Sequence, residues 1–155
     1  MEFFPSVLNF DESKAMVENI ESKFDREGFG LWAVELLGDG RFIGFVGLSE
    51  PKFQAHFTPC VEVGWRIARE YWGSGYATEA AKVSIQDGFE RLSLPEIVSL
   101  TAAINKKSIR IMEKIGMKQN PADDFLHPLI DDGHILKPHV LYRLGKSDWL
   151  SRNGR

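Results

Sequence analysis

The chain has little of what marks secreted, membrane-bound or nucleic-acid-binding proteins. It has a single cysteine, Cys60, which excludes an internal disulfide framework and favours a reducing compartment, the cytoplasm. No apolar run reaches the roughly 18 residues of a membrane span. The N-terminus lacks the basic start and apolar stretch of a signal peptide. The net charge is −3 and no basic run is present, so we expect neither a nucleic-acid nor a membrane partner.

What the chain does have is the composition of an ordinary globular protein. Of its 155 residues, 43% are hydrophobic and 26% are charged. This length suffices for one domain with a sizeable core. Internal repeats, low-complexity tracts and linkers are lacking, so we expect one domain over residues 1–155.

The most informative segment runs from residue 61 to residue 80. Its first part alternates apolar and polar residues, which predicts a strand with one face formed by Val61, Val63, Trp65 and Ile67. Gly73 and Gly75 then predict a tight turn, and residues 77–92 are rich in helix formers. A strand that leads through a glycine loop into a helix N-terminus binds anions, because free amides and the helix dipole meet there. This segment therefore predicts a phosphate-bearing cofactor.

Two other phosphate-binding patterns fit the chain poorly. The dinucleotide pattern G-x-G-x-x-G requires a glycine where Thr78 stands. The P-loop pattern requires a glycine at Val140, ahead of Gly145-Lys146-Ser147. A nucleotide-binding domain of another fold is therefore the least favoured of the alternatives.

Several separated segments resemble the GNAT family of acyl-CoA transferases, and within it the ribosomal-protein-alanine N-acetyltransferase branch most. Residues 73–80, GSGYATEA, are similar to the family's CoA loop. Residues 105–117 are similar to its second motif, in which an asparagine after a strand starts a helix that ends in glycine. Residues 139–144 are similar to its last strand. The resemblance covers roughly residues 30–145.

This resemblance implies an α/β fold with a mixed central sheet and helices on both faces. It also implies an acetyl-CoA-dependent N-acetyltransferase, in which a primary amine attacks the thioester directly in a ternary complex. The acceptor would be a small-molecule or peptide amine, such as a protein N-terminus, with acetyl-CoA as co-substrate and no metal. A non-catalytic acyl-CoA-binding module is the alternative from a different class.

The resemblance also assigns residues to the cofactor. The CoA-binding set follows the predicted strand and loop and includes two residues of the second motif: Ile67, Ala68, Arg69, Trp72, Gly73, Ser74, Gly75, Tyr76, Ala77, Asn105 and Ser108. The chain departs from the family pattern at two positions. Glu70 stands where many members carry Gln or Arg, and Arg69 is the neighbouring cation. Met112 stands at the usual position of the tyrosine acid, which leaves the general acid open.

Two residues are candidate catalytic groups. Glu62 lies on the strand before the CoA loop and points away from Val61 and Val63, so we expect it to face the cleft and act as the base. Its structural alternative is an ion pair with Arg66, which shares its strand parity. Ser108 is the candidate donor to the thioester, with a purely backbone-bonding role as the alternative.

The segment from Gln119 to Pro138 has no clear periodicity and holds the remaining candidates. His127 is a possible base, although loop histidines are more often only hydrogen-bonded. Two aspartate pairs, at positions 123–124 and 131–132, would attract a cationic acceptor if they formed an open acidic wall. The alternative is a solvated acidic loop.

The remaining pattern predicts a helix over 11–27, capped by Asp11 or Ser13, and strands over 30–37, 41–48, 96–104 and 139–144. It also predicts a short helix over 106–115 with Asn105 as N-cap. The family fold begins with one further strand and helix, so we expect its first strand to be missing here. The sheet edge left open would then be covered by N-terminal residues or by a second copy in a homodimer.

Overall fold

The computed structural model describes residues 2–4 and 6–153. Its four α-helices are α1 (Phe10–Glu27), α2 (Tyr76–Glu90), α3 (Lys106–Lys114) and α4 (Lys146–Arg152). Two short 3₁₀ turns are η1 (Arg69–Tyr71) and η2 (Pro121–Asp123). The strands are β1 (Leu31–Glu35), β2 (Phe42–Ser49), β3 (Glu62–Ile67), β4 (Glu96–Ala102), β5 (Lys118–Gln119), β6 (Phe125–Leu126) and β7 (Pro138–Gly145).

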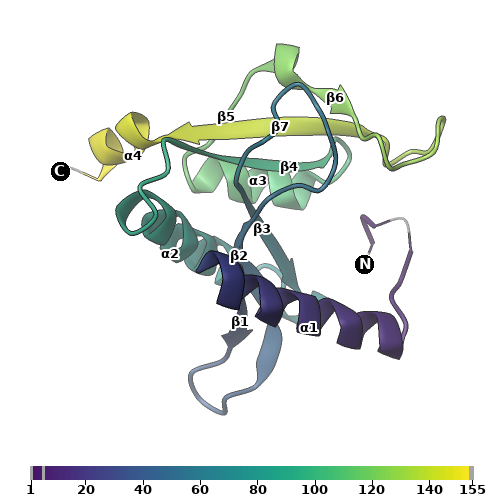
Figure 1. Ribbon diagram of the computed structural model, residues 1–155, viewed down its shortest axis with the longest axis vertical. Helices are drawn as coiled ribbons and strands as arrows, with labels where there is room; N and C mark the ends of the chain where they lie inside the picture. The colour runs from purple at the N-terminus through teal and green to yellow at the C-terminus, as the bar shows by residue number, and fades with distance from the viewer. Residues whose placement is uncertain (1, 5, 154–155) are drawn as a thin grey trace.

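The strands form one mixed sheet. Its order is β1-β2-β3-β4-β7-β5, and β6 also pairs with β7. β3 and β4 are parallel, and the other pairings are antiparallel. In Figure 1, α1 crosses in front of the sheet and α3 lies behind it. The predicted α/β class, with a mixed sheet and helices on both faces, is confirmed.

The hydrophobic core lies on the side of the sheet that α2 and α3 cover. It joins inward residues of the strands to Ala81, Ile85 and Phe89 of α2 and Met112 of α3. In contrast, none of the 18 residues of α1 is buried. One face of the sheet therefore packs against α2 and α3, and on the other face Phe57, Val98 and Leu141 form a second, smaller buried cluster.

The start of α1 differs from the prediction. The N-cap is Asn9, whose side chain accepts from the amide of Glu12 at 2.9 Å, while the Glu12 carboxylate accepts from the amide of Asn9 at 2.8 Å. This reciprocal capping box satisfies two helix-end donors at once, so it prevails over Asp11 and Ser13. Gly28, with φ +73°, ends the helix as predicted.

The C-terminal third is more regular than the sequence pattern suggests. The predicted irregular segment contains β6 and η2, and Gln119 extends the short strand β5. The unpredicted helix α4 places the Trp149 ring 5.3 Å from that of Phe89. Within residues 2–4 and 6–153 no strand precedes α1. No helix in this part of the chain is both long and apolar enough to cross a membrane.

Candidate active site

The sheet opens between β3 and β4. The two strands align at a single pair, Glu62 with Val98, and the Val98 amide donates to the Val61 carbonyl at 3.0 Å. The Ser99 hydroxyl donates to the Val63 carbonyl at 2.9 Å, and beyond this point the described residues show no further pairing. Because backbone groups alternate along a strand, those of Trp65 point toward the gap. A ligand can therefore bind the free edge of β3.

The glycine loop lies where β3 ends. Gly73 and Gly75 have φ values of +81° and +86°, and Gly75 is the N-cap of α2 without a side-chain cap. A Cβ added at either glycine would meet no atom of the described residues within 4 Å. Packing therefore does not require glycine here, whereas the left-handed backbone and the close approach of a ligand do. The free amides of the first turn of α2 make this loop an anion-binding site.

A cavity of about 500 Å³ joins the loop to α3. Eight of the predicted cofactor-binding residues line it: Ile67, Trp72, Gly73, Gly75, Tyr76, Ala77, Asn105 and Ser108. Ala68, Arg69 and Ser74 belong to the same segment but are not part of the lining, and neither is Glu62. The structure thus brings the loop and the second motif together around one space, and the binding roles themselves stay predictions.

The cavity has a basic wall that sequence reasoning missed. Lys107, Arg110 and Lys114 of α3 line it, and the Lys107 ammonium lies 4.3 Å from the centre of the Trp72 ring. Their spacing of three and four residues places these cations on one helix face, and it was visible in the sequence. Positive charge next to free amides suits a ligand with several phosphates.

Ser108 has its acceptor positions filled and its proton free. Its hydroxyl oxygen accepts from the Asn105 amide at 3.0 Å and from the Trp65 indole at 3.2 Å. Asn105 is held in turn, because its oxygen caps α3 by accepting from the Ser108 amide at 3.2 Å. A hydroxyl has two lone pairs and one proton, so Ser108 can still donate into the cavity. The alternative that its side chain bonds only backbone is wrong.

Glu62 lies on the opposite face of β3, beneath α1. Its carboxylate accepts from the Ser49 hydroxyl at 3.1 Å and has no ion pair with Arg66, so that structural alternative is wrong. Burial raises the pKa of Glu62 from 4.5 to about 6, partly opposed by the Ser49 hydrogen bond and by the charge of Lys23 on α1. A carboxylate with this pKa is well suited to accept a proton near neutral pH.

Met112 and His127 lie in surroundings that favour a structural role. Met112 is 1% exposed in the core and carries no ionisable group, so it cannot act as the missing acid. The His127 ring packs 4.5 Å from the Phe53 ring and 4.8 Å from the His139 ring, and burial lowers the pKa of His127. In the described part of the chain no group of three or more His, Cys, Asp or Glu side chains forms a candidate metal site.

Two of the four aspartates in the acidic segment are paired with cations. Asp123 accepts from the Arg143 guanidinium at 2.8 Å, and Asp132 lies 3.0 Å from the Lys137 ammonium. Asp124 is bonded by the Gln119 amide at 3.0 Å. These partners reduce the free negative charge of the segment and favour the alternative of a solvated loop, and the acidic wall stays a prediction.

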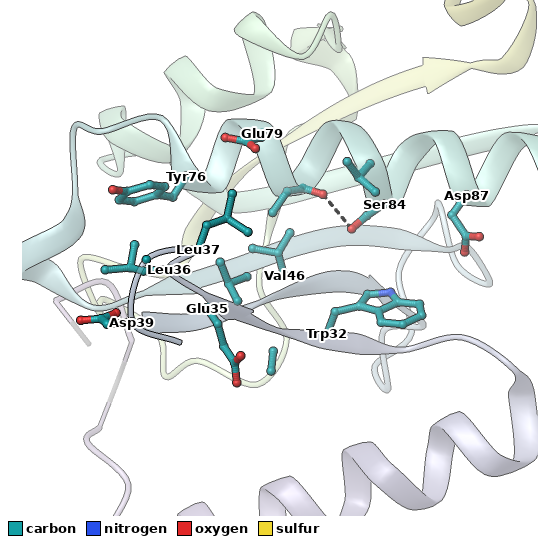
Figure 2. A pocket seen from close by; sticks show the side chains of 15 residues that line it. Trp32, Glu35, Leu36, Leu37, Asp39, Val46, Tyr76, Glu79, Ser84 and Asp87 are labelled. Atoms are coloured by element: carbon teal, nitrogen blue, oxygen red, sulfur yellow. Dashed lines mark hydrogen bonds between the residues drawn. The ribbon is translucent and has the colours of Figure 1, made fainter. Parts of the chain in front are cut away.

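A second, larger hollow lies between β1 and α2 (Figure 2). Its volume is about 940 Å³, and its lining is mainly apolar, with Trp32, Val46 and Val83 among the residues. The Ser84 hydroxyl donates to the Ala80 carbonyl of its own helix at 3.0 Å, so it offers no free proton. No lysine or arginine is among its lining residues, whereas four carboxylates are, so the smaller cavity is the better candidate for binding an anionic cofactor.

Comparison with known proteins agrees with this geometry. The family described as the acetyltransferase (GNAT) domain matches residues 1–118. An FsC-acetyl coenzyme A-N(2)-transacetylase of Aspergillus fumigatus is 30% identical in an alignment 135 positions long, which covers 79% of this chain and 53% of that protein. An uncharacterized N-acetyltransferase of Bacillus subtilis is 31% identical over 88 residues, which are 57% of this chain and 50% of that protein.

The fold is also found among solved structures. The ribosomal-protein-S5-alanine acetyltransferase of Vibrio fischeri superimposes with a TM-score of 0.74 at 19% identity, over 95% of this chain and 80% of that one. At this identity the likeness concerns the fold alone. The chain spans about half the length of the first curated relatives that it matches, between 50% and 53% of each.

Proposed function

The chain belongs to the GNAT family of acetyltransferases, and from this premise we propose that it is an acetyl-CoA-dependent N-acetyltransferase. The reaction moves the acetyl group from acetyl-CoA to a primary amine in a ternary complex. One domain over residues 1–155 would carry it, with no metal. We place the reaction in the cytoplasm on the ground of the single cysteine.

The cofactor is proposed to bind along the opening of the sheet. The amides after Gly73 and Gly75 would receive the pyrophosphate, with Lys107, Arg110 and Lys114 supplying positive charge. The free backbone of Trp65 would bond the pantetheine arm and polarise the thioester carbonyl. These groups need no rearrangement, because the glycine loop already has the left-handed backbone that the site requires.

Two side chains would take part in the chemistry, Glu62 on one face of β3 and Ser108 of α3 on the other. Glu62 takes the proton from the acceptor ammonium, since a free lysine amine, with a pKa of about 10.4, is almost entirely protonated at neutral pH. The neutral nitrogen then bonds to the acetyl carbon as the carbon–sulfur bond breaks. As the amide forms, the nitrogen gives up a second proton and the sulfur takes up one, so CoA leaves as the thiol. Ser108 assists by donating a hydrogen bond to the departing sulfur.

The observation that carries this proposal is the position of Ser108. It lines the same cavity as the glycine loop, and two donors already occupy its oxygen. The test is CoA release from acetyl-CoA in a broad amine screen, together with calorimetric binding of acetyl-CoA, NAD and ATP. We expect binding of acetyl-CoA alone and turnover with at least one amine.

The second candidate is a non-catalytic acyl-CoA-binding module. It is favoured by the burial of Met112 at the position where many family members have the tyrosine acid. Acetyl-CoA binding without CoA release from any amine would support this module. Binding of NAD or ATP in place of acetyl-CoA would contradict both candidates.

A further inference from the structure

Arg66 lies on the acceptor side of β3. It shares the face of Glu62 and Gly64, and its partner across the sheet is Phe45 of β2. It also lines the cavity that contains the glycine loop and Ser108. The side chain is therefore at the border between the cavity for the cofactor and the face beneath α1.

The Arg66 guanidinium has no anionic partner among residues 2–4 and 6–153. No ion pair includes it there, and its Nε atom is buried without a hydrogen bond. Its contacts are aromatic, with the central carbon 4.0 Å from the Phe4 ring centre and 5.3 Å from that of Phe45. Burial lowers the pKa of Arg66, but a guanidinium stays protonated in proteins.

A half-buried cation without a counter-ion is unfavourable unless a ligand supplies the negative charge. Guanidinium binds carboxylate and phosphate groups through two parallel hydrogen bonds, which makes it selective for anions that present two oxygens side by side. The phosphates of CoA are one source of such an anion. However, the glycine loop and the α3 cations already serve them, while the Arg66 side chain leaves β3 on the opposite face to Trp65.

The strand position between Arg66 and Glu62 on this face carries no side chain. Gly64 lies midway, and a Cβ there would meet no atom of the described residues within 4 Å. Four residues of extended strand separate the two Cα atoms by about 13 Å. This face of the strand thus presents a carboxylate, a glycine and a guanidinium in a row.

We propose that the acceptor is an amine that also carries a carboxylate, which Arg66 binds while the amine faces Glu62. This inference rests on the proposed acetyl transfer and narrows its acceptor class to amino acids and related amino-carboxylates. It also disfavours polyamines, because an unpaired guanidinium repels a substrate that carries only positive charge.

The test compares acceptors that differ only in the carboxylate. Glycine, β-alanine and γ-aminobutyrate are each set against their amides, with spermidine as the all-cationic probe. CoA release gives kcat/KM, and calorimetry on the enzyme with bound CoA gives the affinity of the same pairs. We expect at least one acid to exceed its amide by about tenfold or more, as for the loss of a charged hydrogen bond.

Variants assign this preference to the side chain. Arg66→Gln should lower the kcat/KM and the affinity of each acid to those of its amide. Arg66→Lys should restore part of the difference. Arg26→Gln, at an exposed arginine of α1, is the matched control and should keep the preference. The KM for acetyl-CoA should be the same in all four proteins.

Each contrary result has its own meaning. Equal turnover of acids and amides would overturn the inference and leave the acetyl transfer intact. A raised KM for acetyl-CoA in Arg66→Gln, with an unchanged acid-to-amide ratio, would overturn it by assigning Arg66 to the CoA phosphates. If no amine is acetylated, the proposed function fails. In that case calorimetry still tests the inference, which is overturned if each acid binds no better than its amide or if neither binds.

Discussion

Burial of Glu62 affects both the proposed catalysis and the stability of the fold. It sits beneath α1, where burial raises its pKa to about 6 and a single hydroxyl, that of Ser49, donates to it. The same burial that makes it a better base makes its charged form unfavourable in the folded protein. Activity and stability should therefore respond to Glu62 in opposite directions.

For activity, Glu62→Gln removes the proton acceptor and keeps the shape of the side chain. We expect kcat to fall by about 10²-fold or more, with an unchanged affinity for acetyl-CoA. In the parent protein the rate should rise with pH through about 6, as the carboxylate loses its proton, and the variant should lack this rise. Steady-state rates from pH 5 to pH 9 provide the measurement. A full-rate variant would transfer the role to water.

For stability, the sign follows from the raised pKa. The folded state binds the Glu62 proton more tightly than the unfolded state does, so stability falls as pH rises from about 4.5 to about 6. At pH 8, Glu62→Gln should therefore be more stable by about 2 kcal/mol, from 1.36 kcal/mol per pKa unit. At pH 4 the gain should vanish. Urea unfolding at pH 4 and pH 8 measures this gain in the free energy of unfolding. Glu35→Gln, at an exposed carboxylate, is the control.

Ser108 offers a second test at the level of one residue. Ser108→Ala removes the free proton from the cavity and leaves Trp65 and Asn105 each without one acceptor. We expect kcat to fall by about tenfold or more, since general-acid assistance contributes at least that much, with little change in KM for acetyl-CoA. A variant with unchanged kcat would show that water alone protonates the sulfur.

At the scale of elements, the turn from β3 into α2 is the part that the ligand needs most. Gly75 and Gly133 both have positive φ, +86° and +81°, and neither has a described atom within 4 Å of an added Cβ. Substitution by alanine at either position should therefore lower the free energy of unfolding by a similar amount, about 1 kcal/mol. The two glycines differ in location: Gly75 lies in the loop proposed to bind the pyrophosphate, and Gly133 lies in the loop before β7.

The two alanine variants thus separate backbone strain from ligand binding. We expect Gly75→Ala to weaken acetyl-CoA binding strongly, because a methyl group would stand where the pyrophosphate approaches the loop amides. Gly133→Ala should bind acetyl-CoA like the parent protein. Calorimetric titration of both variants is the measurement. Equal affinities in the two would refute the assignment of the loop to the pyrophosphate.

At the scale of the whole molecule, β1 is an edge strand. Its described partner is β2 alone, and the Trp32 side chain, which lines the hollow next to it, is 50% exposed. An open edge with apolar neighbours favours pairing with another strand. We therefore predict a homodimer in which β1 pairs with its copy.

This assembly is tested by closing the edge. The Gly30 carbonyl accepts from the Leu48 amide of β2, and the Leu36 amide donates to the Arg41 carbonyl just before β2, so by alternation the Ala33 amide points outward. Ala33→Pro should therefore abolish dimers without breaking the hairpin, and Ala33→Ser should keep them. Light scattering coupled to size exclusion gives the mass. A parent protein that is monomeric at high concentration would contradict the prediction.

The sequence by itself determined the local parts of this protein. Glycines at positions 73 and 75 fixed the turn, because few other residues adopt positive φ. Asn105 capped α3 as its residue type and position predicted, and the alternation around Val63 gave the strand. Each of these outcomes depends on neighbours within a few positions, which is why pattern and propensity could find them.

How these parts act together depends on contacts between segments that are distant in the chain. Trp65 and Asn105 are far apart in sequence, yet both donate to Ser108 and so leave its proton free. The pairing of Asp123 with Arg143 cancels a charge that looked free in the sequence, while Arg66 is left without a counter-ion among the described residues. Hydrogen-bond saturation and desolvation depend on which chain segments meet in space, and no local pattern encodes that.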